Sequence, residues 1–146
     1  MFNDNATKWI YKTSFPSVFG GGAEFVEEVV NAMKLEGWND DDVFAVNLSL
    51  VEAITNAIEH GNQENPEKTV HVTCVLFPSL IRLIVRDEGE GFLWGNVPDP
   101  RKNDRICCPS GRGLFLINGF MSKVVHNSHG NEITMERARS EEPCLA

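Results

Sequence analysis

A chain of 146 residues, of which 42% are hydrophobic and 23% charged, can bury one core, so we expect a single domain that needs no structural metal or disulfide. No apolar run is long enough to cross a membrane and no signal-peptide pattern opens the chain, which favours a cytoplasmic protein. The net charge of −8 argues against direct binding to nucleic acid, because phosphate backbones are bound by clustered Lys and Arg.

The domain bounds and the state of the cysteines can also be predicted. We expect a flexible N-terminus over residues 1–7, one domain over 8–138 and a flexible tail over 139–146. The cysteines show no Cys-x-x-Cys spacing and are interpreted as reduced thiols, although the adjacent pair could be redox-sensitive; they are Cys74, Cys107, Cys108 and Cys144.

The first predicted elements are a strand and a helix. Residues 7–16 alternate between the two faces of a short strand. After a glycine triplet, apolar residues recur at helical spacing over 23–38, where Gly37 suits the helix exit.

A second helix, expected over Val43–Asn62, carries the first candidate site residues. The polar run 39–42 supplies N-cap candidates for it. At about 100° per residue, its apolar residues fall on one side, while Glu52, Asn56 and Glu59 gather on the other. Glu52 and Asn56 are one turn apart, so both could address one ligand or one hydrated metal ion. The alternative is an ordinary solvent-exposed helix face.

Two β-rich runs, 69–77 and 80–87, predict an antiparallel hairpin. The two-residue period places Asp87 on the apolar face of the second run, so its carboxylate points inward. Because burying an ionised group is costly without partners, Asp87 calls for hydrogen-bond donors. Gly89 and Gly91 follow directly, and their backbone would allow a flat ligand to approach closely.

The proline-rich segment 93–110 lacks helical and strand periodicity and predicts a long loop, which could serve as a lid. It ends at Gly111-Arg112-Gly113, which open a short apolar helix whose free N–H groups could bind an anion. A last hairpin is expected over 122–138.

Three motifs in this order resemble those of the Bergerat-fold ATPases, the superfamily of gyrase, the ninety-kilodalton heat-shock protein, sensor histidine kinases and MutL. Within it, the chain resembles the anti-sigma factor serine/threonine kinases. EAITNAIEHGN is similar to the N box, DEGEGF to the first glycine box and GRGLFLI to the second. The resemblance covers roughly residues 8–138 and implies an α/β two-layer sandwich, with a mixed, mostly antiparallel sheet and helices on one face.

The resemblance also implies roles for individual residues. Glu52 would be the catalytic base, Asn56 would hold Mg²⁺ against the phosphates and Asp87 would accept a hydrogen bond from the adenine amine. ATP would be bound by residues of all three motifs: Asn56, Asp87, Gly89, Gly91, Gly111, Arg112, Gly113 and Leu114. His60 could contact the same site or simply complement the helix dipole.

The function implied by this resemblance is that of an ATP-dependent serine/threonine protein kinase and anti-sigma factor. Such a protein binds a sigma factor and phosphorylates a serine on an anti-sigma-factor antagonist, and a homodimer is compatible with the family. One alternative is a non-catalytic ATP-binding module that binds proteins in a nucleotide-dependent way. Another, the catalytic domain of a sensor histidine kinase, is disfavoured because no preceding helical hairpin carries a phosphorylatable histidine.

Overall fold

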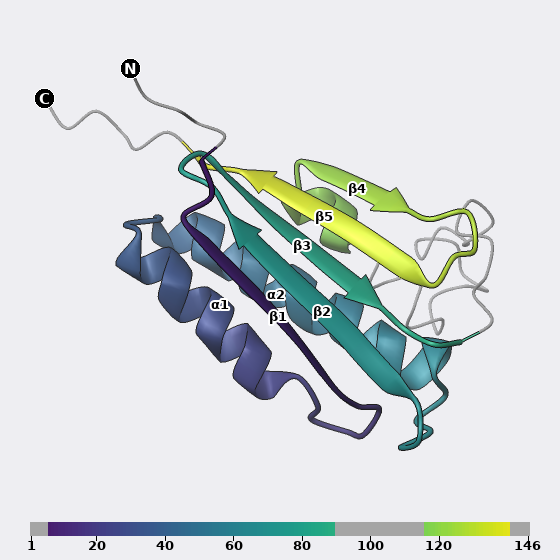
Figure 1. The fold of residues 1–146 in the computed structure, drawn as a ribbon. Coiled ribbons are helices and arrows are strands. Elements are labelled where there is room, and N and C mark those ends of the chain that lie inside the picture. Colours follow the sequence, from purple (N-terminus) through teal and green to yellow (C-terminus); the bar gives the residue numbers. More distant parts are fainter. Residues whose placement is uncertain (1–5, 90–115, 141–146) are drawn as a thin grey trace, which may run out of the picture.

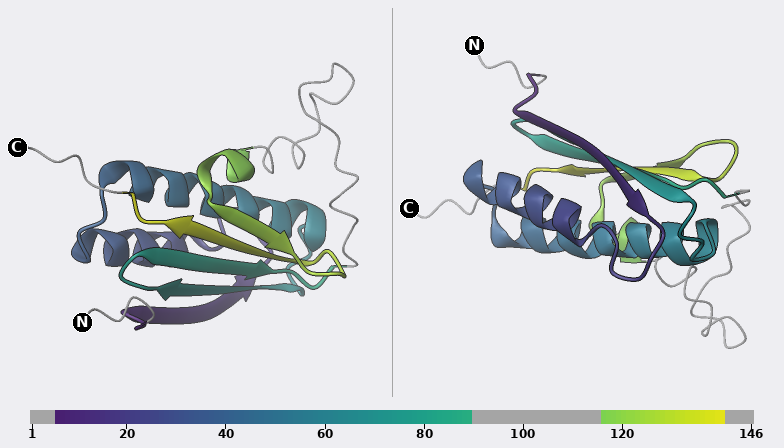
Figure 2. Two further views of the ribbon diagram at one scale, coloured as in Figure 1. Left: turned by 90° about the horizontal axis from the view of Figure 1, so that it is seen from above. Right: turned by 60° about the horizontal axis from the view of Figure 1, so that its bottom comes forward.

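The computed structural model of the protein describes residues 6–89 and 116–140. These residues form two layers, a five-stranded sheet and helices that cover one of its faces (Figure 1, Figure 2). The chain is also helical at 116–120. The other elements, in chain order, are β1 Trp9–Pro16, α1 Ala23–Leu35, α2 Asp40–Asn56, the π-helical turn η1 Ala57–Gly61, β2 Thr69–Leu76, β3 Leu80–Arg86, β4 Lys123–His126 and β5 Glu132–Ala138. The predicted α/β sandwich is therefore confirmed.

The sheet has the strand order β1-β2-β3-β5-β4. Both predicted hairpins, β2–β3 and β4–β5, are present. Long-range pairing joins β1 to β2 and β3 to β5. All four pairings of the described strands are antiparallel, so the mixed sheet implied by the resemblance is purely antiparallel in this part of the chain. One row of neighbouring residues crosses all five strands and faces the helices: Tyr11, Cys74, Leu83, Met135 and Val124.

Capping residues and apolar spacing determine where the helices begin and end. In α1, Phe25, Val29 and Met33 recur at helical spacing and are buried against the sheet. Gly37 follows the helix with a φ of 80°, a left-handed conformation that glycine adopts without steric cost. The next helix, α2, begins at Asp40, three residues before the predicted start, because the Asn39 side chain accepts a hydrogen bond from the Asp42 N–H at 2.8 Å.

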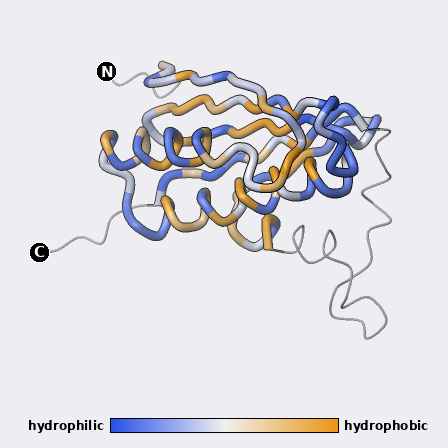
Figure 3. The backbone as a smooth tube through the Cα atoms, turned by 90° about the horizontal axis from the view of Figure 1, so that it is seen from below, coloured by the Kyte–Doolittle hydropathy of each residue, from blue (hydrophilic) through white to orange (hydrophobic). Residues whose placement is uncertain are grey.

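The core lies between the two layers, where the hydrophobic segments of the strands and helices face one another (Figure 3). Strands β2 and β3 alternate strictly between buried and partly exposed residues, as their sequence predicts. Cys74 is a free thiol at the centre of this core, and burial raises its pKa to about 12. The other three cysteines lie outside the described residues.

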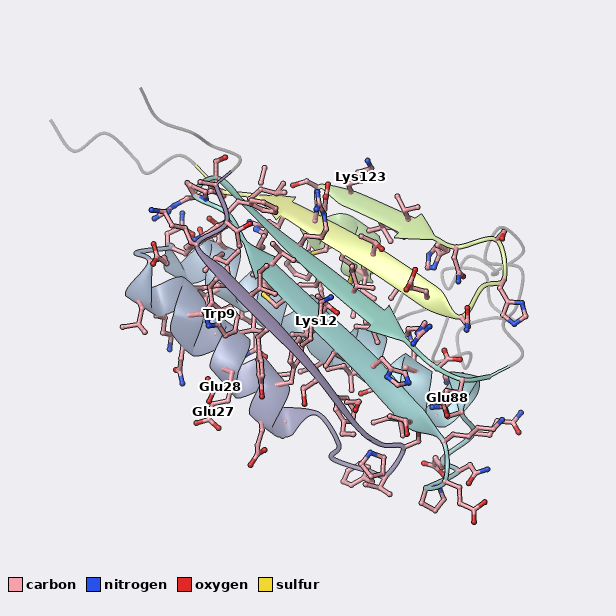
Figure 4. The ribbon with its side chains drawn as sticks, in the orientation of Figure 1. Trp9, Lys12, Glu27, Glu28, Glu88 and Lys123 are labelled. Atoms are coloured by element: carbon pink, nitrogen blue, oxygen red, sulfur yellow. The ribbon has the colours of Figure 1, made fainter. Side chains whose placement is uncertain are left out.

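Among the described residues, no helix covers the opposite face of the sheet, which mixes polar and apolar side chains. A row across it runs through Ile10, Val75, Arg82, Glu136 and Lys123. Within this row, Arg82 Nε donates to Glu136 Oε2 at 2.6 Å. Lys12 also projects from this face (Figure 4). Arg82 and Arg86 of β3 therefore point away from the core.

A buried carboxylate ties the start of α2 to the end of β5. Asp42 is fully buried and accepts hydrogen bonds from Arg137 Nε at 2.8 Å, Ser140 Oγ at 2.7 Å and Ser140 N–H at 2.9 Å. Burial alone would raise the pKa of Asp42, but these donors together outweigh burial and lower it. Arg137 also donates to the Phe120 carbonyl. Ser140, in the stretch predicted as tail, is thus held by α2.

Candidate functional site

Asp87 follows β3 directly and continues its inward face. Its side chain is 8% exposed, as the two-residue period predicts, and burial raises the pKa of its carboxyl group. Oδ1 accepts the Gly89 N–H at 2.8 Å. The Asp87 backbone pairs with Asn131, whose carbonyl accepts the Asp87 N–H at 2.9 Å and whose Nδ2 donates to the Asp87 carbonyl at 3.0 Å. Asn131 therefore fixes the Asp87 backbone, and the Gly89 N–H fixes its carboxylate.

Two glycines make room for this carboxylate. A Cβ at Gly61 would collide with the carboxyl group of Asp87, and a Cβ at Gly89 would collide with the Gly61 carbonyl. Any larger residue at either position would displace the Asp87 turn. Gly89 was among the predicted site residues, whereas Gly61, which lies within the EAITNAIEHGN motif, was not.

Asn56, the last residue of α2, faces Asp87 across a small pocket. Its side chain is 8% exposed, which excludes the solvent-exposed interpretation for this residue. The pocket combines these two residues and the polar residues Asn131 and Glu132 with apolar walls from both layers and from the helix at 116–120: Ala53, Ala57, Val85, Ile117 and Ile133. An acceptor carboxylate between apolar walls suits a flat heterocycle with an exocyclic amine, and the Asn56 amide lies at the same pocket.

In the structure, the residues of the predicted polar stripe of the second helix lie at different surfaces. Glu52 is partly exposed one turn before Asn56, while Glu59 lines a different, larger pocket on the α1 side of α2. His60 does not line the Asp87 pocket, and its Nε2 lies 3.9 Å from Glu59 Oε2. Five predicted nucleotide-binding residues lie outside the described part of the chain: Gly91, Gly111, Arg112, Gly113 and Leu114.

Asn62, which was not among the predicted site residues, is a fully buried amide that joins three segments around the site. Its Nδ2 donates to Ser17 Oγ at 2.7 Å and to the Thr69 carbonyl at 3.0 Å, and its Oδ1 accepts the Glu88 N–H at 2.7 Å. Glu88 lies at the ends of β2 and β3 (Figure 4). The amide therefore fixes the turn that contains Asp87 against the end of the second helix.

A π-helical turn delivers Gly61 and Asn62 to these positions. The Asn62 N–H donates to the Ala57 carbonyl, five residues earlier, at 2.8 Å. Such wider turns are rare within helices and occur often at functional sites. Its residues are ordinary helix formers apart from Gly61, so residue propensity gave no signal for it.

In the part of the chain that the structure describes, no group of three or more His, Cys, Asp or Glu side chains is placed to hold a metal ion. None of the helices described between residues 6–89 and 116–140 is long and apolar enough to cross a membrane.

Comparison with known proteins places this geometry in a family. The model of the histidine kinase-like ATPase domain matches residues 23–137. An anti-sigma F factor of Geobacillus thermodenitrificans is 33% identical over 98 residues, which cover 64% of this chain and 66% of that protein. An anti-sigma F factor of Bacillus cytotoxicus is 36% identical over 77 residues, covering 50% and 51%. The chain thus spans between half and two thirds of the length of these relatives.

A solved structure supports the same fold. The structure of the RsbU and RsbW domains of Rv1364c from Mycobacterium tuberculosis superposes with a TM-score of 0.65, covering 95% of this chain and 35% of that one, at 14% identity. At this identity the likeness concerns the fold alone. Because the family model spans most of the sequence and the antiparallel sheet, the N-box helix and the inward Asp87 are all in place, the chain belongs to the histidine kinase-like ATPase domain family.

Proposed function

We propose that this protein is an ATP-dependent serine/threonine protein kinase that acts as an anti-sigma factor in a partner-switching system. In such a system it would bind a sigma factor and phosphorylate a serine of an anti-sigma-factor antagonist. Family membership supports ATP as the nucleotide, and the names of the similar proteins support the anti-sigma role. The observation that carries the proposal is the placement of Asn56 and Asp87 in one pocket, with Glu52 one turn before Asn56.

The polar and apolar lining of the pocket suits the adenine end of ATP, and the pocket, of about 20 Å³, would widen around the base. The Asp87 carboxylate would accept a hydrogen bond from the exocyclic amine, and a buried carboxylate gains from a neutral donor of this kind. Ala53, Val85 and Ile117 would contact the faces of the base, since apolar walls exclude water from such hydrogen bonds.

Two residues of α2 would serve the phosphate end. The Asn56 carboxamide would ligate Mg²⁺, whose preferred ligands are oxygen atoms. Bound Mg²⁺ would neutralise charge on the phosphates, the main requirement of phosphoryl transfer. The Glu52 carboxylate would take the proton of the attacking serine hydroxyl, a role that its partial exposure to solvent permits. The hydroxyl oxygen of that serine would form a bond to the γ-phosphorus of ATP as the bond between this phosphorus and ADP breaks.

The test has a binding arm and a transfer arm. Isothermal titration calorimetry should show Mg-ATP binding by the wild type, weaker binding by Asn56→Ala and Asp87→Asn, and near-normal binding by Glu52→Gln. Radiolabel from the γ-phosphate of ATP should pass to a serine of a purified antagonist protein with the wild type but not with Glu52→Gln. The matched control is Glu28→Gln, which removes an exposed carboxylate of α1 that lines neither pocket of α2 and should transfer normally.

The outcomes separate the candidate functions. A wild type that does not bind Mg-ATP would refute the proposal. Binding of ATP without a phosphoprotein would instead favour a regulatory module that uses the nucleotide only as an effector. Phosphohistidine on a partner would place the chain with the sensor histidine kinases.

A further inference from the structure

The larger pocket of the described residues lies on the other side of α2 from the Asp87 pocket. It is a groove of about 380 Å³ between the loop before α1, the start of α1 and the end of α2 with η1. Its apolar lining is formed by Phe19, Val26, Val51, Ile54 and Ile58. This volume matches that of pockets that receive apolar side chains or small ligands.

The groove has an exposed aromatic rim. Phe19 is 94% exposed, and its neighbour Val18 and the facing Val51 are also exposed to solvent. A cluster of large apolar side chains left in water around a hollow is typical of a site that a partner covers. Exposed Leu35 at the far end of α1 lines no part of this groove, so exposure alone does not define it.

The loop that carries Phe19 is held in place by specific contacts. The Gly21 N–H donates to the Val18 carbonyl at 2.9 Å, which closes the turn under Phe19. Gly22 has a φ of 87°, and a Cβ there would lie 2.6 Å from Phe15 Cζ. The glycine is therefore required both by its conformation and by the Phe15 ring.

The charged residues lining the groove are both acidic, Glu59 and Glu64. Gln63 and Glu64 have left-handed backbones, with φ of 54° and 57°, and the Glu64 N–H donates to the Ile58 carbonyl at 2.7 Å. Strained backbone of this kind persists where the surrounding structure holds it and is common at binding sites. An apolar partner with positive flanks fits this rim, whereas an anionic membrane or nucleic acid does not.

The groove is also next to the proposed catalytic base. At about 100° per residue, Asn56 lies about 40° from Glu52 around α2, and Thr55 of the groove lies about 60° from Glu52 in the other direction. Glu52 thus lies on the surface of α2 between the nucleotide pocket and the groove. A partner peptide bound in the groove would extend over the Glu52 carboxylate.

We propose that this groove docks a segment of the protein substrate in which a bulky apolar side chain is flanked by Lys or Arg. The apolar side chain enters between Val26, Val51 and Phe19, and the basic residues meet Glu59 and Glu64. Docking positions a nearby serine at Glu52, and this second step rests on the proposed kinase function. The docking step itself needs no nucleotide.

A binding experiment without nucleotide tests the docking step. The probe is a short fluorescein-labelled peptide with one phenylalanine and two leucines flanked by arginines, and fluorescence anisotropy measures its affinity. The same peptide with glutamates in place of the arginines, or serines in place of the apolar residues, should bind at least about tenfold more weakly, a factor that corresponds to about 1.4 kcal/mol.

Variants of exposed groove residues localise the binding without disturbing the core. Phe19→Ser should weaken the arginine peptide roughly fivefold to tenfold, whereas Leu35→Ser, an equally simple change of an exposed apolar residue, should not. Glu59→Gln combined with Glu64→Gln should reduce the preference for arginine over glutamate flanks, and Glu28→Gln on the outer part of α1 should leave it unchanged.

Several results would overturn the inference. These are no measurable binding of the arginine peptide, equal binding of the glutamate peptide, and equal effects of Phe19→Ser and Leu35→Ser. If kinase activity is found, Phe19→Ser should raise the KM for the protein substrate and leave Mg-ATP affinity unchanged. A failure of ATP binding would refute the proposed function while leaving the peptide result to decide the docking site.

Discussion

Replacing Asn62 by alanine should destabilise the fold by about 3 kcal/mol. The change removes the partner of the Glu88 N–H and of the Thr69 carbonyl, and each buried group left unpaired costs about 1–3 kcal/mol. Pro16, opposite Thr69 in the sheet, has no N–H that could replace the lost donor. Ser17 Oγ keeps its hydrogen bond to the Lys68 carbonyl at 2.9 Å, so this third contact adds little to the cost.

Urea unfolding followed by far-ultraviolet circular dichroism measures this free energy. The matched control is Asn65→Ala, because the Asn65 side chain accepts one exposed hydrogen bond, from the Glu67 N–H at 3.0 Å. Its removal should cost less than about 0.5 kcal/mol. Equal losses in the two variants would refute the assignment of Asn62 as the tie between the second helix and the Asp87 turn. Asn62→Ala should also weaken Mg-ATP binding at temperatures where it remains folded.

Three further predictions concern single buried groups. Gly61→Ala should weaken ATP binding at least about tenfold in calorimetry, because its methyl group meets the Asp87 carboxylate; Gly119→Ala, which has open space for a Cβ, should not. The pKa of Asp42 is lower in the folded protein than its unfolded value of about 3.9, so its carboxylate stabilises the fold above that pH. This stabilisation is lost as the pH falls through the lower folded pKa. Asp42→Asn should therefore cost more stability at about pH 7 than at about pH 3 in urea titrations. Cys74 should react with Ellman's reagent only as fast as the protein opens, since its thiol is buried with a pKa of about 12; fast reaction in the folded state would contradict this.

The strands and their faces were predictable because local periodicity determines them. Alternation in 69–77 and 80–87 predicted the hairpin, and the same period carried Asp87 to the inner face. The cost of burying a carboxylate then indicated that Asp87 needs a donor, which the Gly89 N–H partly supplies. Glu52 and Asn56 could be paired for a similar reason, since helical spacing alone places them one turn apart.

The parts that sequence analysis missed depend on contacts between distant segments. Asn62 joins Ser17, 45 residues earlier, to Glu88, 26 residues later, and no local pattern specifies such partners. The start of α2 was placed too late because the choice among Asn39, Asp40 and Asp42 as the cap depends on backbone geometry. The polar stripe was treated as one surface, although the sheet covers Asn56 while Glu59 faces the groove.

The π-helical turn imposes a fixed residue count on this part of the chain. Between Asn56 and Asn62 it holds more residues per turn than an α-helix would, so a deletion of one residue would rotate everything beyond it by about 100°. Gly61 would then leave the Asp87 carboxylate, and the amide of Asn62 would turn away from Ser17 and Glu88. Functional variants of this segment should therefore differ by substitution and keep its length, whereas the exposed loop before β2 can change length with little effect on the pocket.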